Sequence, residues 1–254
     1  MKLLVAGWKN TSLVDVYGYV SFTIWTCGCN LRCPFCHNWR IADKDPALCR
    51  EIDVIKILED LEASRFLVDY IHVTGGEPLL QHSGLEELFT GADALGVKRS
   101  LNSNLTVPRP LRILLEKKLV DHVATDLKIP PEELYGLTRE LSILYWRRFI
   151  ESLSLVKEYG IKLELRIPIW KKITADVLSR YLGEIEPAVD KDNTLILLNP
   201  LLKDPFVKPR DTAWCSENLG VSEKLIEQLI ETLRSKGFSK IAVKSIPGFA
   251  GSRL

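Results

Sequence analysis

Four of the six cysteines of this chain lie within ten residues, directly after a run of β-branched and aromatic residues. Cys29, Cys33 and Cys36 follow the spacing CxxxCxxC, which lets three thiolates surround one soft metal centre. Structural zinc sites use four protein ligands, and Cys27 is too close to Cys29 to be an obvious fourth. Iron–sulfur clusters are also normally held by four cysteines, so three leave one iron for a ligand from outside the protein. The spacing therefore predicts a reactive iron–sulfur centre.

Two alternative roles for the cysteines stay open. A closed zinc loop would need Cys49 or Cys215 to fold back as the fourth ligand. A disulfide framework is typical of oxidising compartments. We expect a cytoplasmic chain instead, because the first residues, MKLLVAGWKN, lack the pattern of a secretory signal. Cys49 and Cys215 stand alone in the sequence, and we expect no second cluster from them.

The elements that must position these cysteines alternate between strands and helices. We expect strands at residues 19–25, 70–74, 97–102, 120–127, 161–167, 194–198 and 241–244, with Pro168 ending the fifth. We expect helices at residues 51–63, 85–95, 109–117, 139–159, 173–182 and 222–235. This alternation predicts an α/β fold with a parallel sheet, and six or seven such units fit a full or partial barrel.

Length and charge limit the classes of function. A chain of 254 residues is within the range of one α/β barrel, so we expect a single domain over residues 1–254, with a core at about 12–200 and a C-terminal extension at 201–254. The formal net charge of +1 does not indicate a nucleic-acid partner. No apolar stretch is long enough to cross a membrane. The irregular segment 199–221 could contribute to the site or be an ordinary surface loop.

The CxxxCxxC spacing, with the aromatic Phe35 before the last cysteine, resembles the signature of the radical S-adenosylmethionine (SAM) superfamily. The resemblance implies a partial (β/α)6-type TIM barrel, a [4Fe–4S] cluster held by Cys29, Cys33 and Cys36, and SAM bound to the fourth iron. It also implies reductive cleavage of SAM to a 5′-deoxyadenosyl radical.

A second motif, GGEP at Gly75, Gly76, Glu77 and Pro78, follows the second expected strand and is similar to a motif of the same superfamily. Two glycines would let the strand approach a ligand with bare amides. The resemblance implies that Glu77 accepts from the amino group of SAM. Taken alone, the motif is also compatible with an ordinary turn between a strand and a helix.

After the third expected strand, Asn102-Ser103-Asn104-Leu105 resembles the (D/T)TNG turn of glycyl-radical activating enzymes, with Asn in place of Asp and Leu in place of Gly. The resemblance implies polar contacts from Ser103 and Asn104 to SAM. The alternative is an Asn-rich turn that satisfies its own backbone.

After the fourth expected strand, Asp126-Leu127-Lys128 matches the DLK segment of the same activating enzymes. The resemblance implies that Asp126 helps to hold a monovalent cation beside the SAM carboxylate and that Lys128 lies on the substrate side. Arg166, at the end of the fifth expected strand, is either a polar contact to SAM or a surface residue.

We expect the histidines to pack within the protein and not to bind a metal. His37 continues the cluster loop as Cys-His-Asn, which is found in pyruvate formate-lyase activating enzyme, and we expect its backbone to pack near the SAM adenine. His72 and His122 lie within strand patterns, so we expect interior or sheet-face residues and not metal ligands.

Residues 12–18, SLVDVYG, resemble a segment of anaerobic ribonucleotide reductase activating proteins. The resemblance implies a large glycyl radical enzyme as partner, such as anaerobic ribonucleotide reductase, and an electron donor such as flavodoxin or ferredoxin. The alternatives are a radical SAM enzyme acting on a small molecule, peptide or RNA-related substrate, a zinc-binding module without activity, and a barrel whose cluster only carries electrons.

Overall fold

The computed structural model describes residues 1–201 and 207–244, and the chain divides into two compact units. One unit comprises Met1–Asn30 and Asn38–Ala124, and the other comprises Leu31–His37 and Thr125–Leu254. Parts of the expected C-terminal extension, residues 202–206 and 245–254, lie outside the described residues. The expectation of a single domain stays a prediction.

The first unit contains a sheet with the strand order β3-β1-β2-β4-β5-β6. Strand β1 is antiparallel to β2 and β3, whereas the pairs β2–β4, β4–β5 and β5–β6 are parallel, as the sequence predicts. The strands are β1 (Lys2–Val16), β2 (Tyr19–Thr26), β3 (Arg50–Asp53), β4 (Tyr70–Gly75), β5 (Lys98–Asn102) and β6 (His122–Asp126), whose last two residues belong to the second unit. The helices are α1 (Trp39–Ala42), α2 (Val54–Ser64), η1 (Arg65–Leu67), η2 (Pro78–Gln81), α3 (His82–Ala94) and α4 (Pro108–Glu116).

The N-terminal half of the first unit differs from the sequence prediction. Residues 51–63 were expected to be one helix, but Arg50–Asp53 is a strand paired with Lys2–Val5 of β1. The helix begins only at Val54, because the Asp53 side chain caps it by accepting from the Ile55 amide. Strand β1 itself was not predicted, since its apolar residues do not alternate regularly with polar ones.

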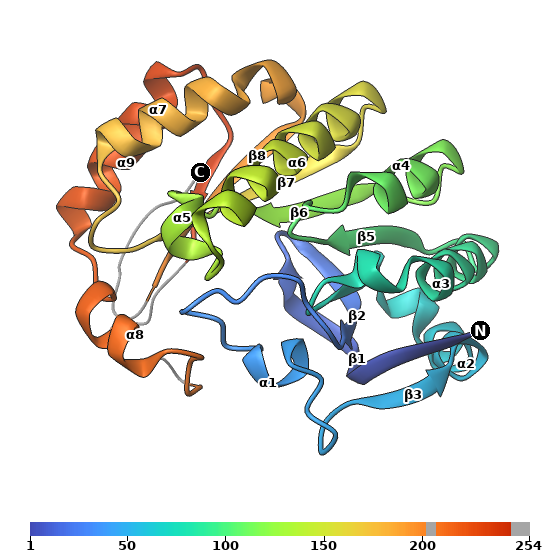
Figure 1. Ribbon diagram of the computed structural model, residues 1–254. Helices are drawn as coiled ribbons and strands as arrows, with labels where there is room; N and C mark the ends of the chain where they lie inside the picture. Colours follow the sequence, from blue (N-terminus) through green and yellow to red (C-terminus); the bar gives the residue numbers. More distant parts are fainter. Residues whose placement is uncertain (202–206, 245–254) are drawn as a thin grey trace. The chain divides into compact units, whose positions relative to one another are not determined.

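The second unit contains the parallel strands β7, β8 and β9 in that order. Helices α7 and α9 lie side by side along them (Figure 1). The strands are β7 (Lys162–Ile169), β8 (Thr194–Pro200) and β9 (Ile241–Val243). The helices are α5 (Pro131–Leu134), α6 (Arg139–Glu158), α7 (Ala175–Ile185), η3 (Glu186–Ala188), η4 (Lys191–Asn193), α8 (Thr212–Asn218) and α9 (Glu223–Ser235).

Two expectations for the second unit are wrong. Pro168 does not end its strand: β7 continues to Ile169, and Pro168 pairs in register with Asn199 of β8. A proline in a strand forfeits only the hydrogen bond of its missing N–H, so pairing through its carbonyl can continue. The segment 199–221 is not irregular throughout, because α8 forms within it, capped by the Asp211 side chain on the Trp214 amide.

Each unit has its own apolar core between its strands and helices. Strand β4 is buried over almost its whole length, as expected of a parallel strand covered on both faces. Fully buried apolar residues of the first unit include Phe22, Ile24, Ile57, Leu61, Ile71, Val73, Leu88, Phe89 and Leu101, and those of the second include Phe149, Leu153, Leu165, Ile167, Leu178, Ile196, Leu198, Leu229 and Leu233. The helices are thus held by their apolar faces.

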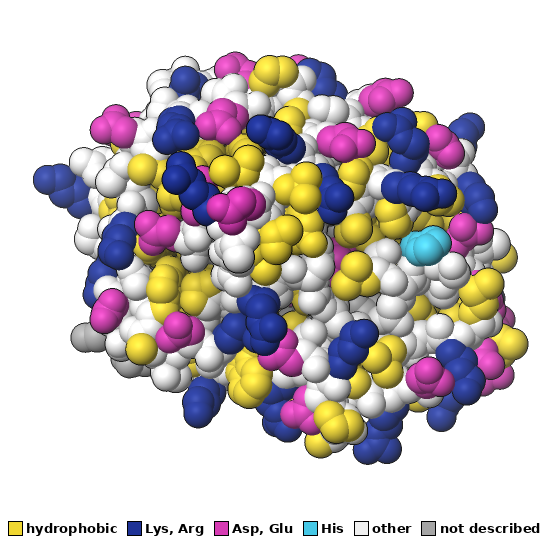
Figure 2. All heavy atoms as spheres, in the orientation of Figure 1, with side chains coloured by type: hydrophobic (Ala, Val, Ile, Leu, Met, Phe, Trp, Pro, Cys, Tyr) yellow, Lys and Arg dark blue, Asp and Glu magenta, His cyan; other side chains and the backbone are white. Residues whose placement is uncertain are grey.

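Charged side chains of both signs are mixed over the face drawn in Figure 2, in line with the net charge of +1. Within residues 1–201 and 207–244, the structure contains no helix that is both long and apolar enough to cross a membrane.

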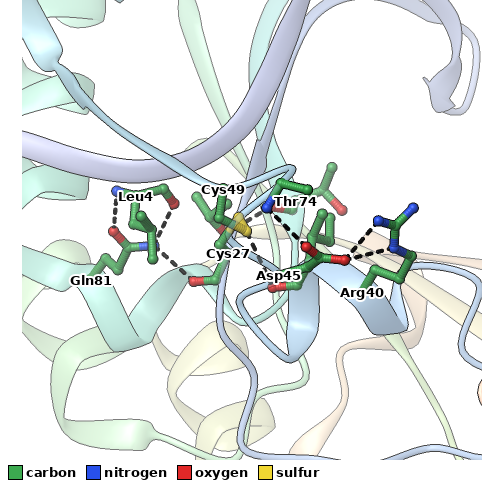
Figure 3. The surroundings of a disulfide bond; sticks show 10 residues. Leu4, Cys27, Arg40, Asp45, Cys49, Thr74 and Gln81 are labelled. Carbon is green, nitrogen blue, oxygen red and sulfur yellow. Dashed lines mark hydrogen bonds and ion pairs between the residues drawn. A yellow bond between two sulfur atoms is a disulfide. The ribbon is translucent and has the colours of Figure 1, made fainter.

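Cys27 and Cys49 form a disulfide, which corrects the expectation that Cys49 stands alone (Figure 3). Strand β1 brings the two together. The Cys27 amide donates to the Leu4 carbonyl, and the residue after Cys49, Arg50, pairs with Val5. Gln81 fixes the same place, since its side-chain amide pairs with both main-chain groups of Leu4 and donates to the Cys27 carbonyl.

We predict that this disulfide stabilises the chain by about 3 kcal/mol, because it closes a loop of intermediate length in the unfolded state. Urea denaturation followed by tryptophan fluorescence should show that loss when wild-type protein is reduced. The Cys49→Ser variant should already show the loss and should not respond to reductant. A Cys215→Ser control should respond as the wild type does, and equal reductant sensitivity in Cys49→Ser would contradict the bridge.

Candidate functional site

The three expected ligand cysteines lie in the loop between β2 and α1, and none of the three is part of a disulfide. In the first unit, the start of this loop is tied to the end of α1. The Gly28 amide donates to the Ile41 carbonyl and the Cys29 amide donates to the Ala42 carbonyl. Carbonyls at a helix C-terminus lack partners within the helix, so they are available to hold the loop. Cys29 is therefore fixed through its backbone.

The two glycines of the GGEP motif pack against the backbone that leads into the cysteine loop. A Cβ on Gly75 would lie 2.4 Å from the Thr26 carbonyl oxygen, and one on Gly76 would lie 2.1 Å from the Gly28 carbonyl oxygen. Gly75 also has a φ of +108°, a conformation that favours glycine. The sequence suggested that the amides of both glycines face a ligand without a partner in the protein. The Gly76 amide instead donates to the Thr26 carbonyl. The glycines permit close contact between two strand ends.

Glu77 is fully buried and tied to two other segments of the first unit. Its amide donates to the Gly28 carbonyl at 2.7 Å. Its carboxylate accepts from the Leu79 amide, from the Ser103 hydroxyl at 2.8 Å and from the Asn104 amide at 2.6 Å. Pro78, which follows, is buried at the first position of η2. The carboxylate therefore braces the turn after β5 against the strand end after β4.

The turn after β5 satisfies its own backbone, as the alternative interpretation of the sequence proposed. The Ser103 hydroxyl accepts from the Leu105 amide, and the Asn104 side-chain oxygen accepts from the Thr106 amide. Leu105 has a φ of +57°, so it adopts the left-handed conformation at the position where the resembling turn has Gly. Asn102, before the turn, donates from its side chain to the Thr74 hydroxyl.

In the second unit, the segment Leu31–His37 packs against the start of α8. The Asp211 amide donates to the Pro34 carbonyl, and the Arg210 amide donates to the Cys36 carbonyl. Phe35 contacts Trp214 at a centroid distance of 6.1 Å. The part of the chain that carries Cys33 and Cys36 is thus held by residues of the segment 199–221. From the sequence, this segment could either contribute to the site or be an ordinary surface loop.

Two further aromatic and sulfur contacts complete this packing. Trp214 also contacts the fully buried Trp170, with ring centroids 5.5 Å apart. The Cys215 thiol is buried and lies 4.0 Å from the Pro34 carbonyl oxygen, and burial raises its pKa. Cys215 therefore packs beside the loop as a buried thiol.

His37 is an exposed residue, yet its pKa is lowered. The larger cause is partial desolvation of the imidazole, and the second is the positive charge of Lys244. Tyr135 lies in the same unit, and its carbonyl accepts from the Arg32 amide. Burial first, and the nearby Cys33 second, raise the pKa of the Tyr135 phenol. The sequence did not indicate Lys244 or Tyr135 as neighbours of the loop.

Asp126, Lys128 and Arg166 gather in the second unit with Glu164 and Lys244. Lys128 Nζ lies 2.9 Å from Asp126 Oδ2, and Arg166 Nε lies 2.6 Å from Glu164 Oε1. Burial alone would raise the pKa of the Asp126 carboxyl, but Lys128, Arg166 and Lys244 together hold it below its usual value. Arg166 is mostly buried and lies within β7, so it is neither at the strand end nor on the surface.

His72 and His122 are buried on one face of the first unit's sheet, which confirms the expectation of interior positions. Each places its Nδ1 atom 2.8 Å from the Ser100 hydroxyl between them. The three residues are neighbours in register across β4, β5 and β6. Because these buried side chains satisfy one another by hydrogen bonds, we assign them a structural role.

With the geometry described, comparison with known proteins decides the family. A sequence model of the radical SAM superfamily matches residues 23–182. The chain belongs to the radical SAM superfamily. A radical SAM methyltransferase from Sphaerobacter thermophilus has a similar structure, with a TM-score of 0.64 and 16% identity over 90% of this chain and 67% of that chain. The predicted α/β fold, a partial TIM barrel, is therefore confirmed.

Curated relatives match shorter stretches. A protein of Methanocaldococcus jannaschii provisionally named a glycyl-radical enzyme activating enzyme is 34% identical over 128 residues, half of this chain and 51% of that protein. A 7-carboxy-7-deazaguanine synthase of Hyperthermus butylicus is 33% identical over 118 residues, or 44% of this chain and 46% of that protein. A pyruvate formate-lyase-activating enzyme of Listeria monocytogenes is 37% identical over 89 residues, or 33% and 35%. The matches span about half or less of each relative's length.

Membership of the superfamily shows an enzyme that uses a [4Fe–4S] cluster and SAM, so the zinc module and the purely electron-carrying barrel are set aside. The donor set fits this cofactor. Cys27 is held by Cys49, so the loop offers three thiols outside the disulfide, which would leave the fourth iron of a cluster to an outside ligand. In the described part of the chain, no three His, Cys, Asp or Glu side chains form a group for a single metal ion. A four-iron cluster meets each thiolate at a different iron, so its ligands need not converge on one point.

We predict that Gly76→Ala destabilises the protein by about 2–3 kcal/mol, because the new methyl group meets the rigid Gly28 carbonyl. Gly183→Ala is the matched control, since nothing lies within 4 Å of the corresponding Cβ and the site is helical. Urea denaturation should separate the two variants, and equal stability of both would contradict the close packing.

We also predict that Lys128→Met lowers the unfolding free energy by roughly 1–3 kcal/mol at neutral pH, because Asp126 loses its closest cation. The range is reduced because the Asp126 side chain is 30% exposed. The folded-state pKa of Asp126 is below the unfolded value, so its contribution is present above pH ~4 and disappears as the pH falls through the folded pKa. The difference between wild type and variant should therefore shrink at acidic pH.

The exposed pair Lys117–Glu86 supplies the control for this prediction. Lys117→Met should change the unfolding free energy little at any pH. A Lys128→Met effect that stayed constant from pH 7 to pH 3 would contradict the electrostatic origin of the effect.

Proposed function

We propose that this enzyme generates a glycyl radical on a partner enzyme. The observation that carries the proposal is the 34% identity with a provisionally named glycyl-radical enzyme activating enzyme. The DLK segment and the Cys-His-Asn sequence, which resemble activating enzymes, support it. When bound, the cluster and SAM supply a one-electron cleavage of the S–C5′ bond and a 5′-deoxyadenosyl radical that can remove a hydrogen atom.

Cys29, Cys33 and Cys36 are proposed as the cluster ligands. Each reaches the cluster from a backbone that is already held, through α1 for Cys29 and through the start of α8 for the segment with the other two. Phe35 and His37 flank the last ligand, and Phe35 is packed on Trp214. A loop fixed in this way needs little rearrangement to bind the cofactor.

The cofactor-binding set is proposed to include the ends of β4 and β5. Gly75, Gly76 and Pro78 shape the backbone around Glu77, whose carboxylate is the proposed acceptor for the SAM amino group. Ser103 and Asn104 are the proposed polar contacts from the next turn. Because the Glu77 carboxylate, which follows β4, accepts from Ser103 and Asn104 in the turn after β5, it sets the separation of these two strand ends before any ligand binds.

Asp126 and Arg166 are the proposed SAM contacts in the second unit, and Lys128 is the proposed residue on the substrate side. A monovalent cation beside Asp126 stays a prediction, and it would share that carboxylate with the Lys128 ammonium group. The depressed pKa of Asp126 keeps it ionised at neutral pH, as a cation or ammonium partner requires.

The partner is proposed to be a large glycyl radical enzyme, with anaerobic ribonucleotide reductase as the specific candidate from the resemblance of residues 12–18. The electron donor is proposed to be a flavodoxin or ferredoxin, because the cluster must be reduced by one electron for each turnover. The absence of a strong net positive charge agrees with a protein partner in place of a nucleic acid.

A second candidate is a radical SAM enzyme with a small-molecule substrate. The 33% identity with a 7-carboxy-7-deazaguanine synthase favours it. Lys128, Arg166 and Lys244 near one another in the second unit would suit a carboxylate substrate.

The deciding experiment follows deuterium from the substrate into 5′-deoxyadenosine. The reduced, cluster-loaded enzyme is mixed with SAM and a candidate glycyl radical enzyme whose glycines carry deuterium. We expect deuterated 5′-deoxyadenosine and a glycyl radical signal, both absent with Cys33→Ala. The opposite result would favour the second candidate. In that case, deuterium would enter 5′-deoxyadenosine from a labelled small carboxylate substrate and not from any candidate polypeptide.

A further inference from the structure

The carboxamide of Asn104 lies against the sulfur of a cluster cysteine. Its Nδ2 atom is 3.8 Å from Cys29 Sγ and 2.9 Å from the side-chain oxygen of Asn30. These are the two donor positions of one amide group. Asn104, Asn30 and Cys29 all belong to the first unit.

The orientation of this amide follows from its other end. The Asn104 Oδ1 atom is 3.0 Å from the Thr106 main-chain nitrogen, which can only donate. The oxygen must therefore face Thr106, and the NH2 group must face Cys29. The Thr106 hydroxyl adds a second donor to the same oxygen at 2.7 Å and accepts from Asn30 Nδ2. Asn30, Asn104 and Thr106 thus close a cycle of hydrogen bonds.

The backbone under this amide is held as well. The Asn104 main-chain nitrogen donates to the Glu77 carboxylate at 2.6 Å. The following residue, Leu105, keeps its positive φ while fully buried, and its amide donates to Ser103. A strained conformation persists where the surroundings over-determine it. The donor is therefore preorganised towards the sulfur.

We propose that Asn104 tunes the cluster by donating a hydrogen bond to the Cys29 thiolate. An N–H donor stabilises the more negatively charged, reduced state of an iron–sulfur cluster and so raises its reduction potential. Asn104 is a positioning residue, because it acts on the cluster through Cys29. The inference rests on membership of the radical SAM superfamily and on the cluster ligand Cys29, and it is independent of whether the substrate is a glycine.

Two substitutions test the inference in the cluster-loaded full-length enzyme. Asn104→Asp keeps the oxygen that accepts from Thr106 but removes the N–H donor. Asn104→Leu removes the donor without adding charge. We expect the ratio of reduced to oxidised cluster at a fixed applied potential to fall about fivefold in Asn104→Leu, the effect of losing one hydrogen bond, and further in Asn104→Asp. Redox titration monitored by electron paramagnetic resonance, without SAM, measures this ratio.

Asn30→Asp is the matched control. It adds a carboxylate next to Cys29 and still accepts from Asn104, so the hydrogen bond to the sulfur is kept. We expect a smaller fall in the reduced fraction than in Asn104→Asp. Iron content per chain is measured in parallel, because a merely structural role would lower the iron content without moving the potential.

A wild-type potential in an iron-replete Asn104→Leu variant would overturn the inference. So would an Asn30→Asp shift as large as that of Asn104→Asp, because added charge would then account for both. Loss of the cluster from both Asn104 variants would also overturn it, since the bond is proposed to tune the cluster and not to hold it. The titration needs no substrate, so its failure is distinguishable from failure of the glycyl radical proposal.

Discussion

The fully buried carboxylate of Glu77 is the constraint on which the proposed site residues of the first unit depend. A buried carboxylate is costly unless its oxygens accept hydrogen bonds, and here they accept from η2 and from two groups of the turn after β5. The main-chain amide of the same residue holds Gly28, next to Cys29. One residue thereby connects the backbone next to Cys29, a proposed cluster ligand, to the turn that carries Ser103 and Asn104.

Much of the fold could be predicted from periodicity because its parallel strands and amphipathic helices have clear patterns. The errors occur where tertiary contacts decide. Arg50–Asp53 has a helical pattern but pairs with β1, and Asp53 then starts the helix. Pro168 is an ordinary breaker by sequence, yet its neighbours in register keep the strand intact. The Cys27–Cys49 bridge depends on β1, which irregular alternation conceals.

The part of the candidate site that a sequence motif defines could be predicted. The part that depends on tertiary packing could not. CxxxCxxC identifies three cysteines that are not in a disulfide, whereas Cys27 is bonded to Cys49. The glycines of GGEP were expected to offer bare amides to a ligand, but the Gly76 amide donates to the Thr26 carbonyl, and the opposing backbone occupies the space that a Cβ on either glycine would need. Trp214 stood out only as an aromatic in a long loop, and Lys244 only as the end of a short strand. Their proximity to Phe35 and His37 needs the three-dimensional structure.

The most direct measurement of the central claim is the coordination of the reconstituted cluster by Mössbauer spectroscopy on ⁵⁷Fe-labelled protein, with and without SAM. We predict a [4Fe–4S] cluster in which one iron differs from the other three and changes its parameters when SAM binds. Four equivalent irons whose Mössbauer parameters do not change when SAM is added would contradict that claim. So would a protein in which no four-iron cluster assembles.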